Sequence, residues 1–338
     1  MSPQWSNFAV GISIFSIGLF KKTVLADSLS SYVGPVFDTD NTAGGVDFFR
    51  AWGASLAYTF QLYFDFSGYS DMAIGVARLF GVRLPINFFS PLKSTSMIEM
   101  WHRWHMTLSR FLREYLYIAI GGNRKGSFRR YVNLLLTMLL GGLWHGAGWP
   151  FVVWGGLQGC YLIINHGWRH FMNTLGWNPS LIMGYREFCW GVTFVAWVIS
   201  FVFFRAPTLE RGSQIVQAML GMSGFEIPAG MVARTGGFGS WLLELGFVAV
   251  HGGGAQLVTN YIWVLISAAI VLTLPNVAQI FNRYEPVLYE SDRAFSDIRG
   301  THMFSWRYSN RWAFVVASGA VAGILTLQQV SEFLYFQF

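Results

Sequence analysis

The chain has 338 residues, of which 12% are charged, 53% hydrophobic and 18% aromatic, and its formal net charge is +6 at pH 7. Because an ordinary soluble domain carries about a quarter charged residues, this composition excludes a typical soluble globular protein and indicates an integral membrane protein. The basic residues lie between hydrophobic runs, where they act as topology signals, and form no single stripe with interleaved aromatic residues. The excess charge therefore does not favour nucleic-acid binding.

Stretches with few or no charged residues recur along the chain. A membrane span needs about twenty apolar residues, so each stretch predicts one membrane-embedded segment, and the longest predicts two. In total we expect roughly seven to nine such segments in an all-α, polytopic helix bundle. The stretches are residues 8–20, 51–64, 131–168, 188–204, 256–274 and 312–331.

The motif QLYFDFSGYSDM, residues 61–72, places Asp65 and Asp71 in largely apolar, aromatic surroundings. Carboxylates at such positions are candidates for a proton relay or for substrate ligands. The simpler interpretation is that both accept hydrogen bonds at a kinked helix end, beside the serines and the glycine of the motif. We favour this structural interpretation.

Residues 94–120 predict one amphipathic helix that lies at the membrane interface or packs as a re-entrant element, because apolar residues recur at helical spacing opposite a charged face. His105 is the ionisable group on the apolar stripe, and both a structural and a functional role are open for it. Glu99, His102 and His105 do not predict a metal site, because residues six apart on a helix point about 240° apart. The stripe consists of Trp101, Trp104, His105, Leu108, Phe111, Leu112 and Tyr115.

A dense basic cluster follows, formed by Arg124, Lys125, Arg129 and Arg130 in a short loop that contains glycine. The positive-inside tendency places this loop in the cytoplasm. A helix that rises about 1.5 Å per residue from this loop reaches His145 after roughly 20 Å. The imidazole is then well inside a hydrocarbon core about 30 Å thick.

Residues 131–168 are thirty-eight residues without Asp, Glu, Lys or Arg, too long for a single crossing. We expect two membrane segments with a break near His145, since glycines at 141 and 142 precede it and the sequence GAGWP follows it. Irregular backbone at membrane depth is tolerated where it is buried in protein or lines a polar cavity. His145 therefore faces a pocket or tunnel in this interpretation.

The motifs of several other classes of protein do not occur. The chain has no phosphate-binding loop, no G-x-S-x-G elbow and no G-x-G-x-x-G that opens a helix after a strand. Cys160 and Cys189 lie in apolar stretches and predict neither a disulfide framework nor a zinc site. We expect no bound metal.

Five motifs in order resemble the membrane-bound O-acyltransferase family, and more narrowly its bacterial branch that O-acetylates alginate and other exported polysaccharides. Members of that branch usually carry further hydrophobic sequence before the segment equivalent to residues 8–20. The resemblance therefore implies an N-terminally shortened form of one family domain, here residues 1–338. The motifs are QLYFDFSGYSDM at 61–72, WHMTLS at 104–109, GGNR at 121–124, LWHGA at 143–147 and EFLYF at 332–336.

This resemblance implies a membrane helix bundle with re-entrant or amphipathic helices around a central tunnel, open to a cytoplasmic acyl donor. The essential histidine of the family falls on His145, and its second active-site polar position falls on His105. His145, neutral in an apolar site, is then the base that takes the proton of the acceptor hydroxyl. His105 orients the thioester or the acceptor, or stabilises developing charge.

The same resemblance implies acetyl-CoA or another acetyl thioester as co-substrate, with no tightly bound cofactor. Arg124, Lys125, Arg129 and Arg130 are candidates to attract the phosphates of that donor, although the same cluster is explained by topology alone. The implied partners are membrane lipid, a polysaccharide acceptor and a periplasmic acetyltransferase resembling a serine esterase. The implied location is the bacterial inner membrane.

Two alternatives are open at this point. One is a non-enzymatic transporter or export subunit for a polysaccharide, with its buried polar residues along the path of the substrate. It accounts for the cavity but not for the motifs, and the internal repeats of many transporters are missing. The other is D-alanyl transfer to teichoic acid, against which the longer alginate-type motifs argue.

Overall fold

The computed structural model describes residues 5–38, 46–288 and 304–327. Most of this part of the chain is helical, and its strands are one short parallel pair, β1 (Glu226–Pro228) and β2 (Val248–Val250). The expectation of an all-α fold is therefore confirmed. The closing motif at 332–336 lies outside the described residues.

The helices have the following bounds in chain order. The first group is α1 (Trp5–Phe20), the π-helix η1 (Lys21–Ala26), α2 (Asp27–Ser30), α3 (Gly34–Phe37), α4 (Phe48–Leu79) and the 3-10 turn η3 (Pro91–Lys93). The second is α5 (Met97–Arg103), α6 (Met106–Phe111), the π-helix η4 (Leu112–Tyr117), α7 (Gly126–His145), α8 (Trp149–Thr174), η5 (Pro179–Leu181) and α9 (Tyr185–Arg205). The third is α10 (Leu209–Met219), α11 (Ala229–Thr235), α12 (Gly237–Glu244), α13 (Gly254–Thr273), α14 (Val277–Ile280), η6 (Asn282–Tyr284) and α15 (Asn310–Thr326).

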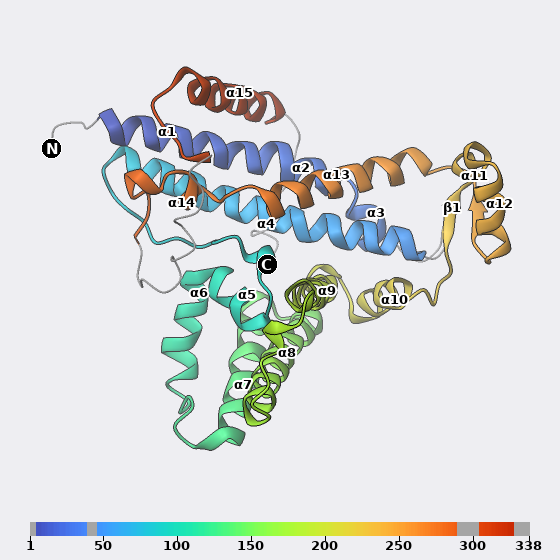
Figure 1. The fold of residues 1–338 in the computed structure, drawn as a ribbon, viewed down its shortest axis with the longest axis horizontal. Helices are drawn as coiled ribbons and strands as arrows, with labels where there is room; N and C mark the ends of the chain where they lie inside the picture. Colours follow the sequence, from blue (N-terminus) through green and yellow to red (C-terminus); the bar gives the residue numbers. More distant parts are fainter. Residues whose placement is uncertain (1–4, 39–45, 289–303, 328–338) are drawn as a thin grey trace.

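Helices α1, α4 and α13 run side by side along the length of the molecule, and α15 packs on α1 (Figure 1). The contact between α1 and α4 is a backbone contact at two pairs of glycines. A Cβ atom on Gly18 would lie 2.6 Å from the carbonyl oxygen of Gly68, and one on Gly11 would lie 2.7 Å from that of Gly75. Small residues at these positions let the two backbones approach closely, as at many helix contacts in membranes.

Helix α4 also carries Asp65 and Asp71, and it runs without interruption through both positions. The predicted helix end is therefore wrong, since Asp47 caps the start of α4 and the helix continues to Leu79. The carboxylates are ion-paired instead: Asp71 Oδ2 lies 2.6 Å from Lys21 Nζ, and Asp65 Oδ1 lies 2.8 Å from Lys22 Nζ. Ion pairing therefore compensates these buried charges.

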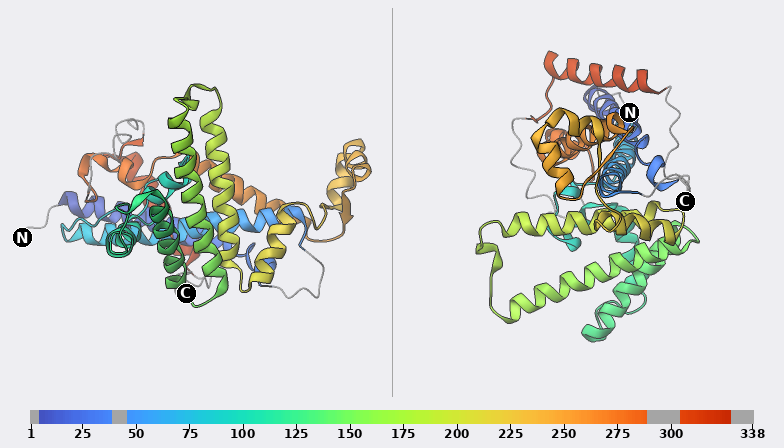
Figure 2. Two further views of the ribbon diagram at one scale, coloured as in Figure 1. Left: turned by 90° about the horizontal axis from the view of Figure 1, so that it is seen from below. Right: turned by 90° about the vertical axis from the view of Figure 1, so that its right-hand side faces the viewer.

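Helices α5 to α9 lie on one side of α4, and α7, α8 and α9 cross the direction of the long helices (Figure 2). The largest apolar core fills the space between α4, α5 and α9, with Tyr58, Trp197 and Phe201 among its buried side chains. Helix α7 ends at His145, and α8 begins four residues later with Trp149 and Pro150. The predicted break of the uncharged run near His145 is therefore confirmed.

Residues 94–120 do not form the single amphipathic helix that their periodicity predicts. The chain leaves α5 after Arg103, and His105 has φ 41° and ψ 57°, the left-handed conformation that no helix interior contains. Helix α6 then starts in a new direction and changes into η4. As a result Phe111 and Tyr115 of the predicted stripe are exposed, whereas Trp101, Trp104 and Leu108 are buried.

Three stretches of helix in the described part are long and apolar enough to cross a membrane: Trp5–Ser30, Tyr185–Arg205 and Gly254–Thr273. They coincide with three of the predicted segments. The segments predicted at 51–64 and 131–168 form α4, α7 and α8, which do not meet the same criteria. The segment predicted at 312–331 is α15 up to Thr326, and its last residues lie outside the described part.

Candidate active site

His145 is the last residue of α7, and its side chain is 9% exposed. Gly146 follows it in an extended conformation, and a Cβ atom there would lie 2.4 Å from the ring of Phe151. Only glycine therefore lets the chain turn at this point without moving that ring. Aromatic rings surround the imidazole, with centroids 4.9 Å away for Trp144, 5.3 Å for Trp154 and 5.1 Å for Phe204.

His105 lies at the junction of α5 and α6. Its ring packs edge-on against Phe66 of α4, with centroids 4.7 Å apart. The chain just after it is fixed by Asn87, whose carbonyl oxygen accepts from Met106 N at 3.0 Å and whose Oδ1 accepts from Thr107 Oγ1 at 2.7 Å. Left-handed backbone at a residue other than glycine costs roughly 1–3 kcal/mol and is often found at functional sites. Here it lies between the end of α5 and the start of α6.

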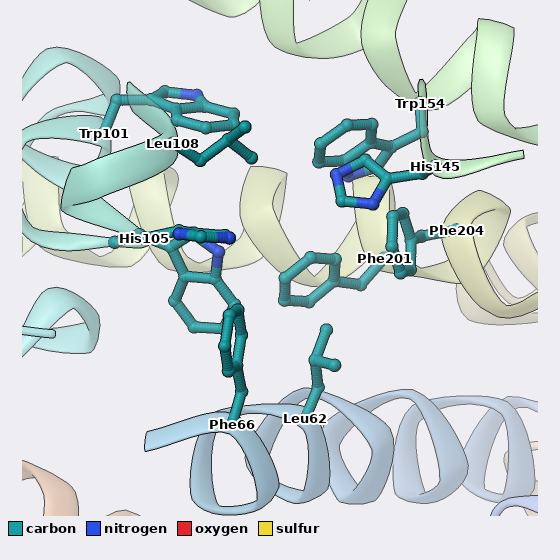
Figure 3. A pocket seen from close by; sticks show the side chains of 10 residues that line it. Leu62, Phe66, Trp101, His105, Leu108, His145, Trp154, Phe201 and Phe204 are labelled. Carbon is teal, nitrogen blue, oxygen red and sulfur yellow. The ribbon is translucent and has the colours of Figure 1, made fainter. Parts of the chain in front are cut away.

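The two histidines face one another across a small pocket (Figure 3). Apart from these imidazoles, its walls are apolar or aromatic side chains from α4, α5, α6, α8 and α9. The cavity has a volume of about 30 Å³, enough for one or two water-sized groups. The lining residues are Leu62, Phe66, Trp101, Trp104, His105, Leu108, His145, Trp154, Phe201 and Phe204.

A buried chain of hydrogen bonds fixes one wall of this pocket. Trp101 Nε1 donates to Gln158 Oε1 at 3.1 Å, and Gln158 Nε2 donates to Ser200 Oγ at 2.8 Å. Gln158 and Ser200 are both fully buried. Because the chain joins α5, α8 and α9, it holds the indole of Trp101 in place against the cavity.

A larger cavity of about 480 Å³ lies on the opposite face of α4. Tyr63 and Phe64 line it, whereas Leu62 and Phe66 point to the histidine pocket, as helical periodicity requires. Lys21 and Arg311 contribute its charged groups, and neither His105 nor His145 borders it. Size alone therefore does not mark the candidate site in this chain.

The basic cluster is not part of the histidine pocket. Arg124, Lys125 and Arg129 are exposed around the start of α7, and Arg130 donates from Nη2 to the hydroxyl of Tyr131 at 2.9 Å. His145 is at the other end of this helix, a distance of about 28 Å at the usual rise per residue. That the basic cluster binds the phosphates of an acyl donor at the start of α7 remains a prediction.

Sequence reasoning singled out both histidines but missed most of the surrounding wall. Leu62 and Phe66 lie beside the two aspartates that drew attention to α4, yet they point to the cavity while the aspartates meet lysines. Phe201 and Phe204 belong to a stretch that reads as a plain membrane helix. In the part of the chain that the structure describes, no three His, Cys, Asp or Glu residues lie close enough to hold a metal ion.

The sequence profile of the membrane-bound O-acyltransferase family matches residues 2–206, which include both histidines and every residue of the pocket. The chain belongs to the membrane-bound O-acyltransferase family. The matched region ends just after α9, the last helix that contributes to the pocket.

Similar proteins are named for three different polymers: peptidoglycan, alginate and teichoic acid. The peptidoglycan O-acetyltransferase of Helicobacter pylori is 45% identical over 66% of this chain and 41% of its own length. A probable alginate O-acetylase AlgI of Pseudomonas putida is 37% identical over 98% of this chain and 61% of its own length. A teichoic acid D-alanyltransferase of Streptococcus thermophilus is 33% identical over 48% of this chain. The chain thus spans about half the length of the curated relatives it matches.

Proposed function

We propose that this chain forms the reaction centre of a multi-pass membrane O-acetyltransferase that transfers an acetyl group from a thioester to hydroxyls of an exported polysaccharide. The observation that supports this most directly is the meeting of His105 and His145 in one small apolar pocket. The two residues are forty positions apart and come from different helices. A simple packing role does not require both imidazoles to face the same cavity.

Acyl transfer needs a base for the hydroxyl proton and a group that holds the reacting partner in place. His145 is surrounded by aromatic rings, an environment that favours the neutral imidazole able to accept a proton. His105 lies across the pocket, where it orients the thioester or the hydroxyl. A cavity of about 30 Å³ suits a short acyl group.

For the donor, we propose acetyl-CoA or another acetyl thioester that enters from the cytoplasm. The exposed basic cluster at the start of α7, Arg124, Lys125, Arg129 and Arg130, is the candidate region that attracts its phosphates. The proposal also has the protein in the bacterial inner membrane, with that loop on the cytoplasmic side as the positive-inside tendency favours. A periplasmic acetyltransferase is the proposed partner on the other side of the membrane.

For the acceptor, two candidates are supported by different similarities. An alginate-like polysaccharide is supported by alginate O-acetylases that align with nearly the whole chain. Peptidoglycan is supported by the higher identity to the Helicobacter pylori protein over a shorter region. Both polymers offer sugar hydroxyls, so the same chemistry in the pocket serves either one.

The test is acetyl transfer by membranes that contain the full chain, with radiolabelled acetyl-CoA and each polymer in separate reactions. We expect release of free CoA and label on alginate or on peptidoglycan, and loss of both in His145→Ala. A different result would show that the chain is a D-alanyltransferase and not an acetyltransferase. In that case neither polymer is labelled, and D-alanine from a carrier protein is incorporated into teichoic acid. Polysaccharide export without any CoA release would favour the transporter.

A further inference from the structure

One indole N–H in the wall of the histidine pocket has no hydrogen-bond acceptor among the described residues. Trp154 is 3% exposed, its indole Nε1 is fully buried, and no hydrogen-bond acceptor lies within reach of it among the described residues. A buried donor without a partner costs about 1–3 kcal/mol. Groups of this kind are rare in folded proteins, and each one calls for an explanation.

The missing acceptor is not common to all tryptophans of the aromatic core, as a comparison of Trp154 with two neighbours shows. The N–H of Trp101, another wall of the pocket, is satisfied by Gln158 at 3.1 Å. Trp197 also has a buried Nε1 without an acceptor in the described part, but it does not line the pocket. Trp154 therefore combines two features: an unused donor and a position at the cavity.

The position of Trp154 relative to His145 is suited to a shared substrate. The two rings pack at 90° with centroids 5.3 Å apart, and both border the same small space (Figure 3). Donors that are fixed in advance in a water-poor site stabilise a developing oxyanion far better than water does.

On the basis of the acyl transfer proposed above, we propose that Trp154 Nε1–H donates a hydrogen bond to the acyl carbonyl oxygen of the thioester donor. As the acceptor hydroxyl oxygen bonds to the carbonyl carbon, its proton moves to His145 and the C=O electron pair moves onto the oxygen held by Trp154. The C=O bond then re-forms, the C–S bond breaks, and the leaving thiolate takes the proton from His145. Trp154 is thus a catalytic residue of the oxyanion type.

The test compares two identical substitutions in the full chain, Trp154→Phe and Trp197→Phe. Each removes one buried indole N–H that lacks an acceptor, but only the first removes it from the pocket. With acetyl-CoA as donor, we expect Trp154→Phe to lower kcat about 10²- to 10³-fold, the usual effect of losing one oxyanion donor. Trp197→Phe is expected to retain kcat within about threefold, and equal losses in the two variants would overturn the proposal.

A second measurement does not depend on turnover. S-acetonyl-CoA keeps a carbonyl near the position of the thioester but cannot transfer an acyl group, and its ¹³C-labelled carbonyl is followed by infrared spectroscopy. We expect the carbonyl band at lower frequency in the wild type than in Trp154→Phe, and no such difference for Trp197→Phe. An unchanged band, or no binding of the probe to the wild type, would overturn the role of Trp154.

These readouts separate the failure of this inference from the failure of the proposed function. If the wild type transfers no acetyl group to any polymer but the carbonyl band still shifts, the assignment of substrate is wrong and the donor contact stands. If the wild type is active and the band does not shift, the function stands and Trp154 is a packing residue. Replacement of Trp154 by 3-benzothienylalanine, which keeps the ring and lacks the N–H, controls for misfolding in both cases.

Discussion

Gly142 of α7 and Gly155 of α8 bring the two helices into backbone contact just beside the active pocket. A Cβ atom on Gly142 would lie 2.3 Å from the carbonyl oxygen of Phe151, and one on Gly155 would lie 2.3 Å from that of Met138. No side chain can turn aside to relieve such contacts, because the neighbouring atoms are backbone. These glycines therefore fix the distance between the helices that carry His145 and Trp154.

We expect Gly155→Ala to destabilise the protein and to lower its activity, because the added methyl group forces α7 and α8 apart. Overpacking of this kind typically costs about 1–3 kcal/mol in the free energy of unfolding. The same substitution at Gly167, also inside α8 but with no atom within 4 Å of the new Cβ, is expected to stabilise by up to about 1 kcal/mol. Thermal unfolding in detergent measures both, and a stable, active Gly155→Ala protein would contradict the close contact.

For His145 we expect the substitution to Gln to reduce acetyl transfer by about 10²- to 10⁴-fold, the contribution of a positioned general base. Glutamine keeps a neutral polar side chain of similar size, so folding should be retained. His102→Gln is the matched control, since His102 is exposed on α5 and does not border the pocket. The measurement is the initial rate of CoA release by each variant. Comparable rates in His145→Gln and His102→Gln would show that His145 is not the general base.

Substitution of His105 by glycine separates folding from function at this position. Glycine adopts φ 41° without strain, so we expect His105→Gly to fold at least as well as the wild type, although the lost ring contact with Phe66 offsets part of the gain. Acetyl transfer is expected to fall at least tenfold, because the second imidazole is gone. Glu285→Gly relieves the same conformation at φ 43° far from the pocket, and it should retain full activity. Unimpaired transfer by His105→Gly would restrict His105 to a structural role.

The pair of Lys21 and Asp71 distinguishes the two interpretations of the buried carboxylates. Lys21→Met leaves the carboxylate of Asp71 without its partner at 2.6 Å, and we expect a loss of about 3–5 kcal/mol in stability. The double variant Lys21→Met with Asp71→Asn should regain most of that loss and retain acetyl transfer, because the pair is structural. A stable double variant without activity would instead assign Asp71 a part in proton transfer.

The sequence predicted the centre of the site better than its walls. A histidine in an uncharged run with glycines on both sides predicts a break in the helix, and α7 ends at His145. Periodicity failed at His105, because helical spacing continues in the sequence through a residue that the backbone places in the left-handed region. That conformation depends on Asn87, an anchor from another segment, and no local pattern reveals it.

Trp154 illustrates a different limit. One apolar stretch contains several aromatic residues, and nothing in their order shows which indole N–H is left without an acceptor. The difference between Trp101 and Trp154 arises from Gln158, which reaches only the first of them. Information of this kind exists only in the packed structure, because it depends on which acceptors three helices bring together.

The paired glycines of α1 and α4 favour one alignment of the two helices. Gly11 against Gly75 and Gly18 against Gly68 are seven residues apart on both helices, so one antiparallel alignment satisfies both pairs at once. The same alignment brings Lys22 within 2.8 Å of Asp65. A slip by one turn would press side chains into backbone and leave a lysine facing hydrocarbon, at a cost of several kcal/mol. The glycines thus make the alignment of α1 and α4 selective, because a misaligned helix pair loses its close contact and its charge neutrality together.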